Sequence, residues 1–210
     1  MSIIDIDLEM KKLAQRRRLF VSEADFQHEL ALLLREDYPQ ADIRLEFTPR
    51  FNPSMHIDIL MRIDGNWIPI ELKYKTKGCE KIVDGEYYHL KNHSAKDVNC
   101  YAYLKDICRI EDIKKQENAF VEGYAIFLTN ELAYTDKPRK KDAFYKEFSL
   151  EDGIAKNGTM SWAAGASEGT KKGCEKDLVL EGCYTLNWEL YSEIDASSTG
   201  TFKYLITQIK

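Results

Sequence analysis

The chain has 210 residues, a length that suits one domain with an extension better than two full domains. Hydrophobic residues make up 44% and charged residues 31%, an ordinary globular composition with enough apolar side chains for a core. The formal net charge of -5 excludes a protein that binds nucleic acid through a general basic coat, so any polyanionic partner must be held by a local patch.

Two features bear on the cellular compartment. The five cysteines are odd in number and form no Cys-x-x-Cys pair, which favours a reduced, intracellular set over a disulfide framework. Residues 1–12 lack the basic and apolar regions of a signal peptide, and no apolar stretch approaches the length of a membrane span. We therefore expect a cytoplasmic protein without a membrane partner.

The first part of the chain predicts a helix followed by three strands. Apolar residues recur at helical spacing over 22–36, and Ser22 is the candidate N-cap. A short strand is expected over 43–47. Alternating apolar residues over 57–63 and 68–74 flank the turn signal Asp64-Gly65-Asn66, which predicts a tight hairpin.

The rest of the chain predicts one more helix and further strands. We expect a loop over 79–92, a helix from Ser94 or Ala95 to Lys115, and a buried strand over 123–129. A basic linker over 137–148 and a glycine-rich surface connection over 151–176 precede a terminal β-pair, indicated by alternation over 184–190 and 202–206. This order predicts an α/β core with a mixed sheet in residues 1–150, and a glycine-rich connection with a β-rich extension in residues 151–210, packed on the same domain.

The hairpin brings three polar residues to one face. We place its loop at Gly65-Asn66, which pairs every apolar residue of one strand with an apolar residue of the other, whereas a one-residue slip would mix the faces. Asp58 then lies opposite Lys73, and Glu71 is the diagonal neighbour of Asp58. Diagonal Cβ atoms are roughly 7–8 Å apart, so the two carboxylates could share one hard cation. The competing explanation is an exposed hairpin face stabilised by an Asp58–Lys73 pair.

This arrangement resembles the motif of the PD-(D/E)XK nuclease superfamily: a strand aspartate, Asp58, and after a hairpin Glu71-Leu72-Lys73. The resemblance covers roughly residues 22–129 in element order. A proline often precedes the motif's aspartate, and here Ile57 takes its place. The resemblance implies a restriction-endonuclease-like core, with a mixed β-sheet flanked by helices, to which this chain adds the β-rich C-terminal extension.

The resemblance also implies a function, the hydrolysis of phosphodiester bonds with Mg²⁺ or Mn²⁺, with DNA favoured over RNA. Asp58, Glu71 and the backbone carbonyl of Leu72 would bind the metal ion, which lowers the pKa of a bound water and polarises the scissile phosphate. Lys73 would orient that water or stabilise the developing charge. A homodimer would bring two such sites to a duplex. The alternative is a non-catalytic module that keeps the fold and binds nucleic acid or protein.

Further residues are expected around this motif. Such nucleases often carry one more carboxylate on the helix before the first strand. Glu23 lies within about 40° of the centre of the apolar stripe, so we prefer it as a metal ligand, with Gln27 beside it at the nucleic acid and Glu29 as the alternative carboxylate. Of the lysines expected to bind phosphates, Lys75 and Lys77 directly follow the motif, Lys91 lies just before the next helix, and a second basic cluster lies further on. The second cluster comprises Lys137, Arg139, Lys140 and Lys141.

Overall fold

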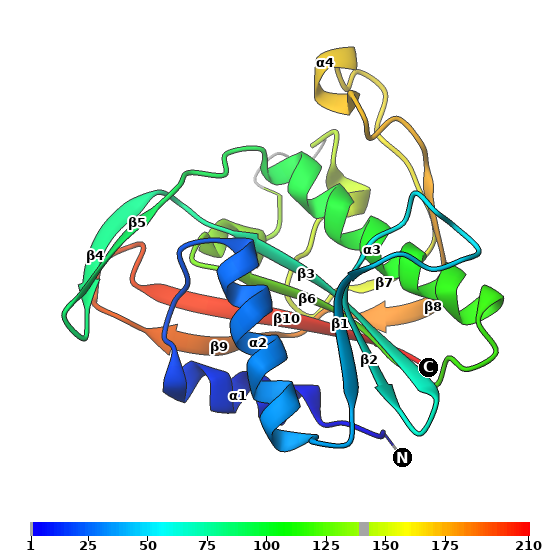
Figure 1. The fold of residues 1–210 in the computed structure, drawn as a ribbon. Coiled ribbons are helices and arrows are strands. Elements are labelled where there is room, and N and C mark those ends of the chain that lie inside the picture. The colour runs from blue at the N-terminus through cyan, green and yellow to red at the C-terminus, as the bar shows by residue number, and fades with distance from the viewer. Residues whose placement is uncertain (1, 139–142) are drawn as a thin grey trace.

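A mixed six-stranded sheet forms the centre of the molecule. The computed structural model describes residues 2–138 and 143–210, and its main sheet has the strand order β1-β2-β3-β6-β10-β9 (Figure 1). β3 and β6 run parallel, and the other neighbours run antiparallel. The predicted mixed sheet is therefore confirmed, and the C-terminal strands belong to the same sheet as the hairpin. The six strands are β1 (Asp42–Phe47), β2 (Ile57–Ile63), β3 (Asn66–Lys75), β6 (Gly123–Thr129), β9 (Trp188–Glu193) and β10 (Thr201–Ile209).

Helices cover both faces of this sheet (Figure 1). α1 (Ile6–Arg16) and α2 (Glu23–Asp37) pack into one core, and α3 (Lys96–Gln116) packs into the core on the other face. All residues of β6 are buried because its side chains alternate between the two cores. Among the described residues, every helix is too short or too polar to span a lipid bilayer.

The helix and strand predictions of the first half hold, with one addition. Ser22 caps α2 by accepting a 3.1 Å hydrogen bond from Asp25 N. The sequence did not predict α1, because the isoleucines and acidic residues near the N-terminus suggested alternation rather than a helical period. Its buried residues, Ile6, Glu9, Met10 and Leu13, follow a helical spacing with a glutamate among them.

Two smaller hairpins replace segments that the sequence assigned to loops. Residues expected to form a loop over 79–92 fold into β4 (Cys79–Val83) and β5 (Glu86–Leu90), and the glycine-rich connection contains β7 (Ala155–Met160), which pairs with β8 (Leu178–Thr185). Short helical turns complete the chain: η1 (Leu132–Tyr134), η2 (Lys146–Phe148) and α4 (Glu168–Lys171). In the second basic cluster, Lys137 is exposed, and Arg139, Lys140 and Lys141 lie outside the described residues.

The β2–β3 hairpin has a different register from the one expected. Its two-residue turn is Asp64-Gly65, with φ values of 50° and 80°, and Ile63 pairs with Asn66. Both turn residues need positive φ, which an Asp-Gly pair accommodates better than Gly-Asn in this twisted hairpin. The shift moves the pairing by two residues and so keeps Ile59, Met61 and Ile63 on their predicted face. Ile57 was expected on that face and instead packs with Leu60 and with Ile113 of α3. The shift also changes the partners: Ile59 lies opposite Ile70, not opposite Leu72.

Candidate functional site

The candidate site lies where β3 extends past its hairpin partner. The pairing of β2 with β3 runs from Ile63–Asn66 to Ile59–Ile70, whereas β3 continues to Lys75 alongside β6. On the side that β2 has left, two backbone N–H groups of β3 donate to carboxylates. Leu72 N donates to Asp58 Oδ2 at 2.6 Å, and Tyr74 N donates to Glu23 Oε2 at 2.7 Å. Two of the predicted acidic residues thus line the open edge of one strand.

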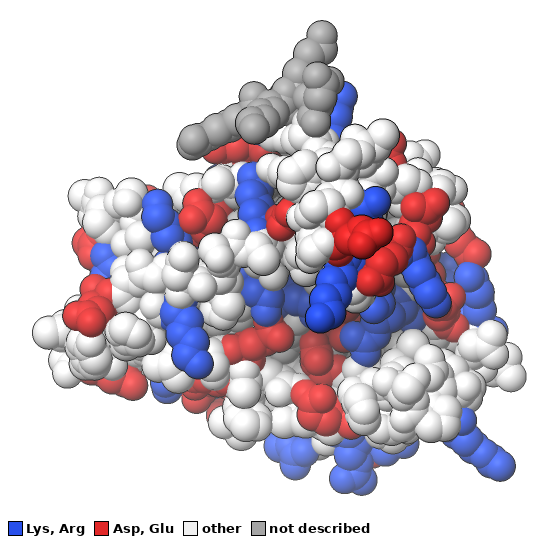
Figure 2. Space-filling model, turned by 90° about the horizontal axis from the view of Figure 1, so that it is seen from above, with Lys and Arg blue, Asp and Glu red and all other residues white. Residues whose placement is uncertain are grey.

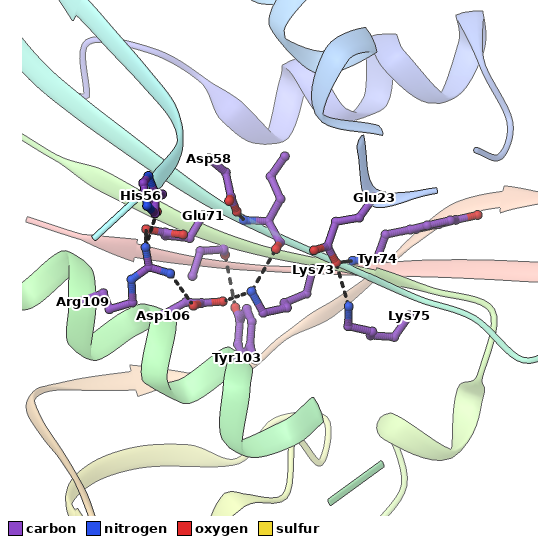
Figure 3. Close-up of polar contacts among 12 residues, drawn as sticks. Glu23, His56, Asp58, Glu71, Lys73, Tyr74, Lys75, Tyr103, Asp106 and Arg109 are labelled. Atoms are coloured by element: carbon purple, nitrogen blue, oxygen red, sulfur yellow. Dashed lines mark hydrogen bonds and ion pairs between the residues drawn. The ribbon is translucent and has the colours of Figure 1, made fainter. Parts of the chain in front are cut away.

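The face of β3 that carries Glu71 and Lys73 is turned toward α3 (Figure 3). Helix α3 supplies Asp106 and Arg109, one turn apart, to the same space. Lys73 Nζ lies 2.5 Å from Asp106 Oδ2 and donates to Leu72 O at 3.1 Å. Arg109 Nη2 lies 3.1 Å from Glu71 Oε1, and Arg109 Nη1 donates to Asp106 Oδ1 at 3.3 Å. The hairpin and α3 therefore enclose one cluster of alternating charges.

Glu71 is the most deeply buried member of this cluster, with 1% of its surface exposed. Its ion pair with Arg109 lacks the direction of a hydrogen bond, and neither of its carboxylate oxygens accepts a hydrogen bond from the described residues. Buried polar atoms are almost always hydrogen-bonded, so an exception calls for an explanation. A carboxylate with spare acceptor capacity beside a second carboxylate, Asp58, has the chemistry of a cation ligand.

The pKa values of the acidic residues reflect this crowding. Burial raises the pKa of Asp58 to about 6, although the hydrogen bond from Leu72 opposes the shift. Burial, followed by the charge of Asp106, raises the pKa of Glu71 well above its usual range, against the opposing effect of Arg109. Burial also raises the pKa of Asp106, despite its contact with Lys73. Each carboxylate is thus ionised at a cost that a bound cation would reduce.

Lys73 remains a cation in this setting. Burial disfavours its charged form, but the neighbouring charge of Asp106 and its hydrogen bond outweigh this effect and raise the pKa of Lys73 to about 12. Its side chain is nearly buried and is held at both Asp106 and Leu72 O. A fixed positive charge therefore lies beside the two candidate metal-binding carboxylates.

The two glutamates considered on α2 have different surroundings. Glu23 Oε2 accepts from Tyr74 N and also from Lys75 Nζ at 2.8 Å, so Glu23 reaches the edge of β3 (Figure 3). Glu29 instead pairs with Arg17 at 3.6 Å. Of the two, only Glu23 contacts the strand that carries the motif.

Gln27 is turned into the protein. Its side chain is buried, and Nε2 donates to Asp58 O at 2.7 Å and to Glu46 Oε1 at 2.8 Å. Glu46 has a φ of 50°, the left-handed region that L residues seldom adopt, and it lies between the pairs Leu45–Ile59 and Phe47–Ile57. Gln27 thus binds the backbone of Asp58 next to Glu46, where the positive φ interrupts the regular geometry of the strand.

The lysines around the site differ in how available they are. Lys77 and Lys91 are exposed, whereas Lys75 is mostly covered and pairs with Glu23. Viewed from above the orientation of Figure 1, basic and acidic side chains are interspersed across a hollowed face of the molecule (Figure 2). This mixture agrees with the net negative charge, and it leaves individual lysines rather than a uniform basic surface to meet a polyanion.

Sequence reasoning missed Asp106 and Arg109. The inward residues of α3 include Tyr103, Ile107 and Ile110, and Asp106 interrupts this stripe as a buried charge. A charged residue at an inward position is rarely tolerated without a partner. That signal was available in the sequence, but its partners, Lys73 and Arg109, become evident only when the helix is placed against the sheet.

Within the described residues, no three His, Cys, Asp or Glu side chains form a ready-made metal-binding group. Mg²⁺ commonly needs only one or two carboxylates, because water and substrate phosphates supply the other ligands. Neither the family models nor the curated proteins with which the chain was compared match it.

Proposed function

We propose that this protein is a cytoplasmic, metal-dependent nuclease with a restriction-endonuclease-like core, acting on DNA in preference to RNA. One observation carries the proposal: Glu71 has two oxygens that accept no hydrogen bond from the described residues, and it lies next to Leu72, whose N–H binds Asp58, and two residues from Lys73. The alternative of a purely structural hairpin face explains the pairing of charges but not the unused acceptors of Glu71.

Asp58 and Glu71 would hold a Mg²⁺ or Mn²⁺ ion, with the carbonyl of Leu72 as the third protein ligand. When bound, the ion would supply an activated water and polarise a phosphate oxygen. Asp58 keeps one oxygen, Oδ1, beyond the hydrogen bond from Leu72 N, and Glu71 keeps both. Glu23, bound to Tyr74 N and Lys75, would fix the end of the strand that carries the ligands.

Lys73 would stabilise negative charge on the phosphate or orient the attacking water. Its pKa of about 12 keeps the ammonium charged at neutral pH, as electrostatic stabilisation requires. Its contact with Leu72 O places the ammonium beside the proposed carbonyl ligand. Asp106 would act through Lys73, as a positioning residue that sets the direction of the lysine.

Binding of the nucleic acid would depend on local lysines because the chain as a whole is acidic. Lys77 and Lys91 are exposed near the end of β3. Lys75 would also contact the nucleic acid once its ion pair with Glu23 breaks. We therefore expect nucleic-acid binding that weakens as salt concentration rises. Contacts of these lysines with phosphates should contribute little preference for base sequence.

The proposal is tested by incubating the protein with linear, circular, single-stranded and branched DNA and with RNA, each in Mg²⁺, in Mn²⁺ and in EDTA. Cleavage of at least one substrate that requires the metal ion supports a nuclease. Binding without cleavage under every condition would favour the non-catalytic alternative.

A further inference from the structure

Arg109 is the closest cation to the proposed metal-binding carboxylate. Its guanidinium contacts Glu71 and Asp106, and it also donates to the carbonyl oxygen of His56 in the segment that leads into β2. A quarter of its side chain is exposed, whereas Glu71 behind it is closed off from solvent. Arg109 thus lies beside Glu71 and Asp106 and is the more exposed partner of Glu71 (Figure 3).

The charges of the cluster explain why Arg109 is drawn there. Asp58, Glu71 and Asp106 are acidic, and Lys73 is committed to Asp106 and Leu72 O. Arg109 is therefore the cation that neutralises the charge of Glu71. A divalent ion bound by Glu71 would lie within a few ångströms of the guanidinium, where like charges repel strongly in a partly buried site. The guanidinium and the metal ion therefore compete for Glu71.

We infer that Arg109 is an internal counter-ion that competes with the divalent metal for Glu71 and, once displaced, binds the phosphate of the substrate. This inference rests on the proposed metal site. A guanidinium offers a planar fork of donors that matches phosphate oxygens. Arg109 is anchored on α3 beside the proposed ligands, so a short movement of its long side chain exchanges a carboxylate for a phosphate without moving the backbone.

The competition is tested by titrating metal-free protein with Mn²⁺ and following the electron paramagnetic resonance signal of the free ion. Arg109→Gln keeps a donor for the His56 carbonyl but removes the charge, and we expect it to bind Mn²⁺ roughly tenfold tighter than the wild type. Arg109→Lys keeps the charge and should remain near the wild-type affinity. Circular dichroism of each variant checks that the fold is retained.

Arg62→Gln is the matched control. Arg62 is also ion-paired and has a similarly exposed side chain, but its partner is Asp42, away from the site. If the gain in Mn²⁺ affinity came from net charge alone, both arginine variants would show it. The gain should also disappear when Arg109→Gln is combined with Glu71→Gln, because Glu71 is the group for which the two cations compete.

The second part of the inference predicts an opposite effect on cleavage. At saturating Mn²⁺, Arg109→Gln should cleave DNA roughly tenfold or more slowly than the wild type, because it lacks a donor to the phosphate. Tighter metal binding combined with slower cleavage supports the inference. Equal Mn²⁺ affinity in the wild type, Arg109→Gln and Arg62→Gln would overturn it while leaving the nuclease proposal intact. No Mn²⁺ binding by any of these proteins would overturn both.

Discussion

The ammonium group of Lys73 pairs with the carboxylate of Asp106, 2.5 Å away on α3, and not with Asp58 on the neighbouring strand. The lysine of the candidate motif is therefore held by the helix that packs on its face of the sheet. Two elements far apart in sequence, β3 and α3, must be docked correctly before this lysine has its observed position. The pair links the stability of the fold to the geometry of the proposed site.

Asp106→Asn should strongly destabilise the protein. It leaves the nearly buried ammonium of Lys73 without its charged partner, and breaking a buried ion pair from one side typically costs about 3–5 kcal/mol. Asp112→Asn is the matched control, since Asp112 lies on the same helix, pairs with Lys115 and is 61% exposed, and an exposed pair of this kind contributes at most about 1 kcal/mol. Urea denaturation measures both. Equal and small decreases in the free energy of unfolding of both variants would show that the buried ammonium of Lys73 does not need Asp106 as its partner.

Asp58→Asn should stabilise the metal-free protein at neutral pH. The folded-state pKa of about 6 lies above the ordinary value of aspartate, so the folded state holds the proton more tightly than the unfolded chain. Protonated Asp58 therefore contributes to the free energy of unfolding, fully below about pH 4, and this contribution is lost as pH rises through about 6. The variant keeps an oxygen acceptor for Leu72 N and avoids this loss, which is roughly 3 kcal/mol for a shift of about two pKa units. Wild type and variant should melt alike near pH 4.

The same substitution should reduce the stabilisation by metal. A ligand that binds only the folded state stabilises it by about 2.7 kcal/mol at a hundredfold excess over Kd, and the variant lacks one of the two carboxylate ligands. Thermal melts in EDTA and in a Mn²⁺ series at constant ionic strength measure this gain. If Asp58 only caps Leu72 N, the variant will be less stable at every pH and its response to Mn²⁺ will equal that of the wild type.

Lys77→Ala should weaken DNA binding more than Lys75→Ala does. Lys77 is exposed, whereas Lys75 must first give up its 2.8 Å contact with Glu23. Removing one phosphate-binding lysine reduces the slope of log affinity against log salt by about one unit. Affinity is measured against salt concentration in the Glu71→Gln background, with Lys11→Ala on α1 as the control lysine. An unchanged slope in the Lys75 and Lys77 double variant would move the binding surface elsewhere.

The sequence predicted that Glu71 and Lys73 share one face of β3 but not which residues are their neighbours. Apolar alternation determines the face, because side chains on a strand repeat every two residues. A two-residue shift leaves that alternation intact, so the pattern alone could not distinguish the expected register, with Ile59 opposite Leu72, from the observed one, with Ile59 opposite Ile70. The Asp64-Gly65 turn decides between them, through two consecutive residues with positive φ.

The residues that complete the site come from long-range packing. Helical periodicity predicted α3 almost to its ends, yet nothing local indicates that Asp106 meets Lys73 or that Arg109 meets Glu71. These contacts depend on the parallel pairing of β3 with β6 and on how α3 crosses them. Glu23 was predicted from its place near the apolar stripe of α2, and its contact with Tyr74 N depends in turn on where β2 leaves β3.

The most direct test of the central claim is a plasmid-nicking assay in Mn²⁺ with the wild type, Glu71→Gln and Lys73→Ala, run beside circular dichroism spectra of the same samples. Glu80→Gln, a 65% exposed glutamate on β4, is the control. We predict nicking by the wild type and the control that EDTA abolishes, and losses of roughly a hundredfold or more in the two site variants with their folds intact. Full activity in both site variants, or wild-type cleavage that persists in EDTA, would contradict the assignment of Asp58, Glu71 and Lys73 as the active site.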